Sequence, residues 1–239
     1  MKYVLTQLVF SAELQVILLF LTTGLLLSGV GQFLRNLQFE KAHRCFLVLA
    51  RFFRWEVYPK NNKLGGVYMQ IPSIKGFFEG KQCNVLVTAK GGGRLRSYYT
   101  TFKIRVKNPQ KRTMAILRED FFQKVNKWIG KQDILIDDPE VDQFFILRSD
   151  EPAFIHELLN EEVKELLKKN HLSFNGYINL HEHELSYTEK NLITKPADIR
   201  RFAGLIQLML CMARRLDNIE IAIDGEQFVN VSKERENGV

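Results

Sequence analysis

Hydrophobic side chains follow one another without a charge over residues 14–34, which read LQVILLFLTTGLLLSGVGQFL. The nearest charged residues are Glu13 and Arg35. A helix rises about 1.5 Å per residue, so this segment would span roughly 30 Å, the thickness of the hydrocarbon core of a bilayer. We therefore expect a single membrane-spanning helix. The alternatives are a cleaved signal peptide, with its cleavage site at residues 29–31, and a buried helix of a soluble core.

The charges after this segment predict its direction in the membrane. Residues 35–54 contain one acidic residue, Glu40, and five basic residues, namely Arg35, Lys41, Arg44, Arg51 and Arg54. Basic flanks stay on the cytoplasmic side, so the sequence predicts one span in the inner (cytoplasmic) membrane with the C-terminal domain in the cytoplasm. Gly24 and Ser28 have the spacing of a small-residue helix contact, which is a cue for a homo-oligomer through the span.

The segment after the span keeps a helical pattern. Over residues 36–54 the apolar positions Leu37, Ala42, Phe46, Leu49 and Phe53 recur at roughly helical spacing. We expect a helix, separate from the first or continuous with it, that packs on the domain while its basic side chains face headgroups or water. The turn-rich residues 59–66, PKNNKLGG, then end it.

From residue 67 to 118 the pattern changes to that of short strands separated by Gly, Lys or Pro. In residues 101–106, Phe102, Ile104 and Val106 alternate with basic neighbours, so one strand face enters a core and the other is basic. A hairpin loop at residues 89–96 adds more cations. The candidate residues for an anionic surface are Lys103, Arg105, Lys107, Arg94 and Arg96.

Several readings of this basic face stay open. It is a solvated exterior, or it contacts anionic lipid, nucleic acid or an acidic protein. Tyr98 and Tyr99 adjoin it, but no aromatic RNA-binding signature is present, so nucleic acid is disfavoured.

A further helix is expected at residues 119–131. The run DPEVDQFFILRSDEP then begins at Asp138, and its residues 144–147 read as a strand buried on both sides. Ser149 or Asp150 is placed to cap the next helix, and Asn160 to cap a second one with acids in its first turn. The acids of residues 137–142 lack the glycine and final glutamate of a calcium loop.

The same run resembles an uncharacterised family of bacterial membrane-associated domains, with the pattern D-P-E-F-D-x-x-F-x-V-x-S-D-D matched at residues 138–151. Val141 replaces the usual Phe, and residues 160–162, NEE, replace Thr-Pro-Glu. The resemblance covers residues 76–216 and is specific around 137–167. It implies a membrane-associated domain and no established activity.

Residues 172–189 predict a hairpin. On a strand, His181 and His183 would face the same side, which makes them candidate zinc ligands, although a third ligand is needed. The alternative is a solvated turn. Residues 196–218 predict a long amphipathic helix that covers a sheet. A strand is expected at residues 218–225, and a disordered tail from residue 232.

The predicted fold class is α+β, with an N-terminal transmembrane helix and an antiparallel sheet covered by amphipathic helices. The predicted organisation is an anchor (1–35), a linking amphipathic helix (36–58), a cytosolic domain (59–222) and a C-terminal tail (223–239). Within the domain, residues 66–148 are rich in strands, and residues 149–218 form a helix–hairpin–helix unit.

Composition narrows the chemistry. The chain has 46% hydrophobic and 26% charged residues, as ordinary globular proteins do, and a net charge of +7. Three distant cysteines, Cys45, Cys83 and Cys211, disfavour a disulfide framework. No nucleotide, nucleophile or metal motif is present, so we expect no catalytic residue and no cofactor. The sequence predicts a membrane-anchored interaction domain with an unknown protein partner. A lipid-contacting module and an enzyme without a recognisable motif are the alternatives.

Overall fold

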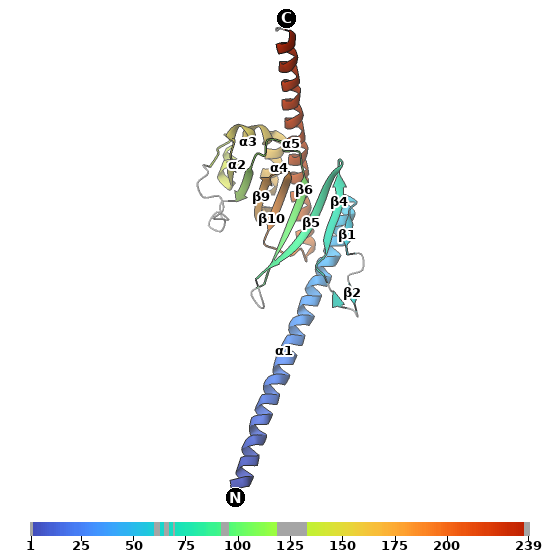
Figure 1. The fold of residues 1–239 in the computed structure, drawn as a ribbon, viewed down its shortest axis with the longest axis vertical. Coiled ribbons are helices and arrows are strands. Elements are labelled where there is room, and N and C mark those ends of the chain that lie inside the picture. Colours follow the sequence, from blue (N-terminus) through green and yellow to red (C-terminus); the bar gives the residue numbers. More distant parts are fainter. Residues whose placement is uncertain are drawn as a thin grey trace.

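The computed structural model describes residues 2–59, 63–64, 67–68, 70–91, 96–118 and 133–236 of the 239-residue chain. A long helix leads into an eight-stranded antiparallel sheet with helices packed against it (Figure 1). The predicted α+β class is thereby confirmed. The two chain ends leave the domain at opposite poles (Figure 1).

The N-terminal helix α1 (Lys2–Phe53) is one uninterrupted element. No Gly or Pro occurs between residues 32 and 53, so nothing ends the helix where the apolar segment stops. Side chains from Val16 to Leu34 are exposed, whereas Ala42, Phe46 and Leu49 are fully buried against the domain. Residues predicted as a linking helix therefore contribute to the core.

Among the described helices, α1 is long and apolar enough to cross a membrane. By length and composition, a membrane anchor and a signal sequence both fit this N-terminal helix.

The sheet has the strand order β1-β4-β5-β6-β10-β9-β7-β8, and every neighbouring pair is antiparallel. A separate pair joins β2 (Lys63–Leu64) to β3 (Val67–Tyr68). The strands of the large sheet are β1 (Glu56–Tyr58), β4 (Ser73–Phe78), β5 (Lys81–Lys90), β6 (Ser97–Arg105), β7 (Met114–Arg118), β8 (Phe145–Ser149), β9 (Gly176–His181) and β10 (Glu184–Glu189).

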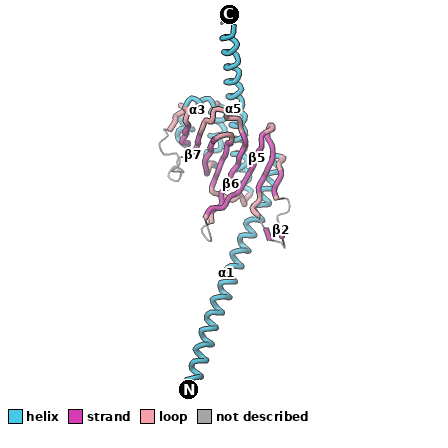
Figure 2. Tube along the Cα trace, in the orientation of Figure 1, coloured by secondary structure: helices cyan, strands magenta, loops and turns pink. Residues whose placement is uncertain are grey.

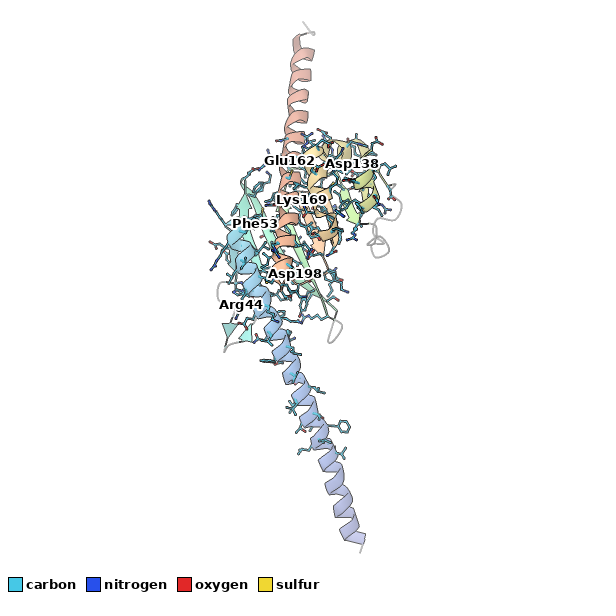
Figure 3. All side chains as sticks on the ribbon, turned by 180° about the vertical axis from the view of Figure 1, so that it is seen from behind. Arg44, Phe53, Asp138, Glu162, Lys169 and Asp198 are labelled. Atoms are coloured by element: carbon cyan, nitrogen blue, oxygen red, sulfur yellow. The ribbon has the colours of Figure 1, made fainter. Side chains whose placement is uncertain are left out.

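Helices cover one face of this sheet and leave much of the other open. The strands lie in front of α1 and α5 in Figure 2, and the reverse view brings both helices forward (Figure 3). In β6, Phe102 and Ile104 are buried on the helix side, while Arg105 is exposed on the open face. The alternation predicted for this strand is confirmed.

Helix α5 (Pro196–Glu236) forms the second long element on the covered face. Its residues Phe202, Ile206, Met209 and Leu216 are buried, as the predicted amphipathic helix requires. The strand expected after residue 218 is not formed, because Ile219 lies three residues after Leu216 and continues the buried stripe. The helix also runs through most of the tail predicted to be disordered.

The segment around residues 138–151 differs from expectation in two ways. Phe144 ends the helix α2 (Pro139–Phe144), so the strand begins one residue later. The acid Asp138 caps α2 by accepting hydrogen bonds from the N–H groups of Glu140 and Val141. The helix that Asp138 caps therefore includes Phe144, although the apolar run 144–147 predicted a strand there.

Neither Ser149 nor Asp150 caps the helix α3 (Pro152–Leu158), whose N-cap residue Glu151 makes no side-chain capping bond. The Asp150 carboxylate instead accepts hydrogen bonds from the N–H and hydroxyl of Thr113, which joins β8 to the start of β7. The cap predicted at Asn160 is confirmed, since its side chain accepts from the Val163 N–H at the start of α4 (Glu161–Asn170). A short 3-10 helix, His171–Ser173, follows.

Candidate anion-binding cleft at the far end of the sheet

The two ends of the sheet lie at different distances from the apolar part of α1. The near end carries the β5–β6 connection, where the Tyr98 ring contacts the Phe39 ring of α1 with centroids 5.8 Å apart. The far end carries the β4–β5 and β9–β10 turns and the end of β6. Arg105 follows Tyr98 by seven residues, which is about 23 Å along a strand.

The predicted basic residues divide between these two ends. Arg105 and Lys107 are exposed at the far end, and neither forms a hydrogen bond or ion pair with another described residue. Lys103 is paired, with its Nζ 2.7 Å from Glu184 Oε1. Arg96 is exposed at the near end, and Arg94 lies outside the described residues. The four described residues therefore do not form one patch.

A cleft of about 900 Å³ opens beside the two unpaired cations, and we name it the distal cleft. One wall comes from the β4–β5 turn and α5. The other wall comes from the end of β6, the following loop and the β9–β10 turn. The first wall consists of Phe77, Glu79, Gly80, Lys81, Gln82 and Asp217. The second wall consists of Arg105, Val106, Lys107, Asn108, Pro109 and His183.

Ion pairs neutralise the charges of the first wall. Lys81 Nζ lies 2.7 Å from Asp217 Oδ2, and Arg214 of α5 forms a two-point contact with the Glu79 carboxylate. The hydrogen bond from Arg214 lowers the pKa of Glu79 below its ordinary value. These contacts fasten the β4–β5 turn to α5, and they leave little free negative charge in the cleft.

The second wall is held by backbone and amide hydrogen bonds instead. The Val106 N–H donates to the His183 carbonyl at 2.9 Å. Asn108, which is buried, donates from Nδ2 to the carbonyls of Glu182 and Arg112 and accepts from the Arg112 N–H. The wall is therefore ordered without using Arg105 or Lys107, whose charges remain available to an anionic ligand.

The histidine pair is not arranged as the sequence predicts. His181 ends β9, but His183 lies in the tight turn, with Glu182 at a φ of 50°. Because the chain reverses between them, the same-face argument for a strand fails. Within the described residues, no group of three or more His, Cys, Asp or Glu side chains is placed to hold a metal ion.

A second polar cluster lies on the covered face and is internally satisfied. The buried Glu189 carboxylate receives two hydrogen bonds from the Arg201 guanidinium and one from the Tyr187 hydroxyl at 2.8 Å. Burial, together with the negative charge of Glu189, raises the pKa of Tyr187 well above its ordinary value. The hydrogen-bond partners of Glu189 named here are protein side chains, so the cluster holds α5 against β10.

Sequence reasoning missed Phe77, Lys81, Asn108 and Asp217 as members of the distal cleft. No local signal marks them, because the cleft joins four segments that are far apart in the chain. Only the basic face of β6 could be predicted, because the alternation of apolar and basic residues lies within one segment of the sequence.

The chain is thus an α+β domain behind a long N-terminal apolar helix. No protein-family model matches it, and no curated protein matches it. Its fold is distantly similar to the crystal structure of the mycobacterial trehalose monomycolate transport factor A, TtfA. That match has a TM-score of 0.40 and 7% sequence identity, and it covers 70% of this chain and 95% of the other.

Proposed function

We propose that the protein is a single-pass, membrane-anchored interaction module whose cytoplasmic domain binds an acidic partner in the distal cleft. The observation that carries the proposal is the placement of Arg105 and Lys107, exposed and unpaired among the described residues, at the end of the sheet farthest from the apolar part of α1. No catalytic role is assigned. The resemblance of residues 138–151 to bacterial membrane-associated domains agrees with this class.

The height of the cleft favours a soluble partner over lipid. From Leu34 to Phe53, α1 rises about 30 Å. The Trp55 indole follows directly and donates to the Phe77 carbonyl at the cleft, with Nε1 and O 3.1 Å apart. Charges in water are screened within about 8 Å at physiological ionic strength. Anionic headgroups at the end of the span would therefore exert little force on Arg105.

The anchor and its direction rest on the continuity of α1 and on its flanking charges. Because the helix passes unbroken from the apolar segment into the core, cleavage near residues 29–31 would cut inside a regular helix. The basic residues Arg35, Lys41 and Arg44 are exposed on this helix, where they would hold the domain on the cytoplasmic side.

Lipid contact is a second candidate, at the near end of the sheet. Lys90 and Arg96 are exposed on the two sides of the β5–β6 connection, and this end lies beside Phe39 of α1. Each basic residue near an anionic surface contributes about 1 kcal/mol to membrane attraction. This contact would steady the domain and need not replace the acidic partner.

Site-specific photo-crosslinking in the intact protein tests the proposal. A photoreactive amino acid at position 82, which lines the cleft, is expected to give a protein adduct in cells, and Arg105→Glu is expected to abolish that adduct. The matched probe at position 90, on the other end of β5, is expected to label lipid or nothing. Adducts at position 82 that are lipid, or that persist with Arg105→Glu, would contradict the proposal.

A further inference from the structure

A second hollow adjoins the distal cleft on the open face of the sheet. It has a volume of about 460 Å³ and lies over the start of β1 and the end of β4. Phe77 and Gln82 line both hollows, and they are direct cross-strand partners of β4 and β5. The two hollows therefore meet at one pair of side chains, and we name the whole the distal groove.

Phe77 stands exposed at that meeting point. Its side chain is 71% exposed, although its backbone carbonyl is fixed by the Trp55 indole. Aromatic side chains, phenylalanine included, are enriched in protein interfaces, and Phe77 presents one from a strand whose backbone is fixed. Its neighbours Phe78 and Gly76 face the helices, so the exposure of Phe77 follows from the alternation of β4.

Basic side chains flank Phe77 on both sides. On one side Arg54 is exposed without an ion pair to a described residue, and the Lys75 ammonium lies over the Tyr58 ring, 5.2 Å from its centre. On the other side are Arg105 and Lys107. The acids of the groove are already engaged: the Tyr58 hydroxyl donates to Glu56 at 2.6 Å, and Glu79 and Asp217 are paired as described above.

The spacing of these groups matches an extended polypeptide. Lys75 lies two residues from Phe77 on the same strand face, about 7 Å away, and Arg105 lies two strands away, about 10 Å. Alternate side chains of an extended chain are also about 7 Å apart. The groove crosses β1, β4, β5 and β6, about 15 Å at the usual strand spacing, which accommodates about five extended residues.

We propose that the distal groove binds an extended segment of an acidic protein, with an apolar side chain on Phe77 and carboxylates toward the cations on either side. This inference rests on the proposed function and specifies the ligand of that site. A phosphate backbone is disfavoured because the cations stand in two separate groups on either side of Phe77 and do not form a continuous basic track. A peptide can place its charges only where the cations lie.

Binding of labelled peptides to the intact protein in nanodiscs tests this assignment. The probe is a short peptide with one leucine and a glutamate two residues away on each side; the controls replace leucine by serine, or use a single-stranded oligonucleotide. The leucine peptide is expected to bind tightest. Three variants are each expected to weaken binding of the leucine peptide about tenfold. They are Phe77→Ala, the double variant Arg54→Glu with Lys75→Glu, and the double variant Arg105→Glu with Lys107→Glu.

The near-end pair Lys90→Glu with Arg96→Glu makes the same charge change and is expected to leave binding unaltered. Preference for the oligonucleotide, equal binding of the serine peptide, or no effect of Phe77→Ala would overturn the groove assignment. If only the Arg105 and Lys107 pair matters, the distal cleft stands without the second hollow. If that pair has no effect and the crosslink at position 82 also fails, the proposed function itself is wrong. All substituted side chains are exposed or at the groove surface, and circular dichroism checks their fold.

Discussion

Gly76 lies where a side chain would overlap the Trp55 indole. A Cβ built on this glycine would collide with Cδ1 and Cγ of the ring. The indole is held by stacking on Phe53 and Phe102, with centroids 4.7 and 5.9 Å away, and by its hydrogen bond to Phe77. Because the ring is fixed on three sides, it cannot move aside easily.

Gly76→Ala is therefore expected to lower the free energy of unfolding by about 1–3 kcal/mol, the usual range for overpacking. Denaturant unfolding of the detergent-solubilised protein, followed by circular dichroism, measures the change. Thr88→Ala, on the exposed face of the neighbouring strand, serves as a control and should change stability by less than about 0.5 kcal/mol. Equal stability of both variants would show that Trp55 has room to shift.

The buried cysteines provide a second residue-scale prediction. Burial raises the pKa of Cys83 to about 12, and burial together with Glu162 raises that of Cys211 to about 11. Since the thiolate is the reactive form, neither thiol should react with iodoacetamide at pH 8 in the folded protein. Mass spectrometry should find both labelled after denaturation. Rapid labelling of the native protein at either position would contradict the buried placement.

At the scale of elements, the β4–β5 turn is fastened to α5 by the Glu79–Arg214 contact. The pKa of Glu79 is lowered in the folded protein, so this contribution is complete above the ordinary value of 4.5 and is lost as the pH falls through the folded pKa. The protection of the turn amides, such as that of Gly80, relative to their intrinsic exchange rate at each pH should therefore decrease below pH 4.5. Glu79→Gln should exchange faster at neutral pH and lose this acid dependence. An unchanged pH profile in the variant would assign the effect elsewhere.

The elements show which structural features periodicity can predict. The two-residue alternation of β6 and the helical stripe of α5 were predicted because each is recorded within one segment. The start of β8 was not, because Phe144 and Phe145 are both apolar and the capping by Asp138 decides which of them is helical. The distal cleft was not predicted either, since its walls meet only when residues 77–82, 105–109, 183 and 217 are brought together by the fold.

At the scale of the whole molecule, the basic flank of the span makes a prediction about topology. In the proposed orientation, with the domain in the cytoplasm, protease added to inside-out membrane vesicles should digest it, whereas right-side-out vesicles should protect it. Reversing Arg35, Lys41 and Arg44 to Glu should reduce the fraction of correctly oriented chains. Digestion in right-side-out vesicles, or a processed N-terminus that begins after residue 31, would contradict the anchored arrangement.

In the proposed anchored arrangement, the continuity of α1 makes the domain and the membrane segment a single lever. A flexible linker would let the domain swivel, but one unbroken helix transmits each change in inclination of the span directly to the groove. At about 30 Å beyond the span, a change of about 20°, which is an ordinary tilt for such helices, would sweep the groove sideways by about 10 Å. Bilayer thickness, or a neighbouring span that leans on the helix, would then decide which partner proteins the proposed groove can reach.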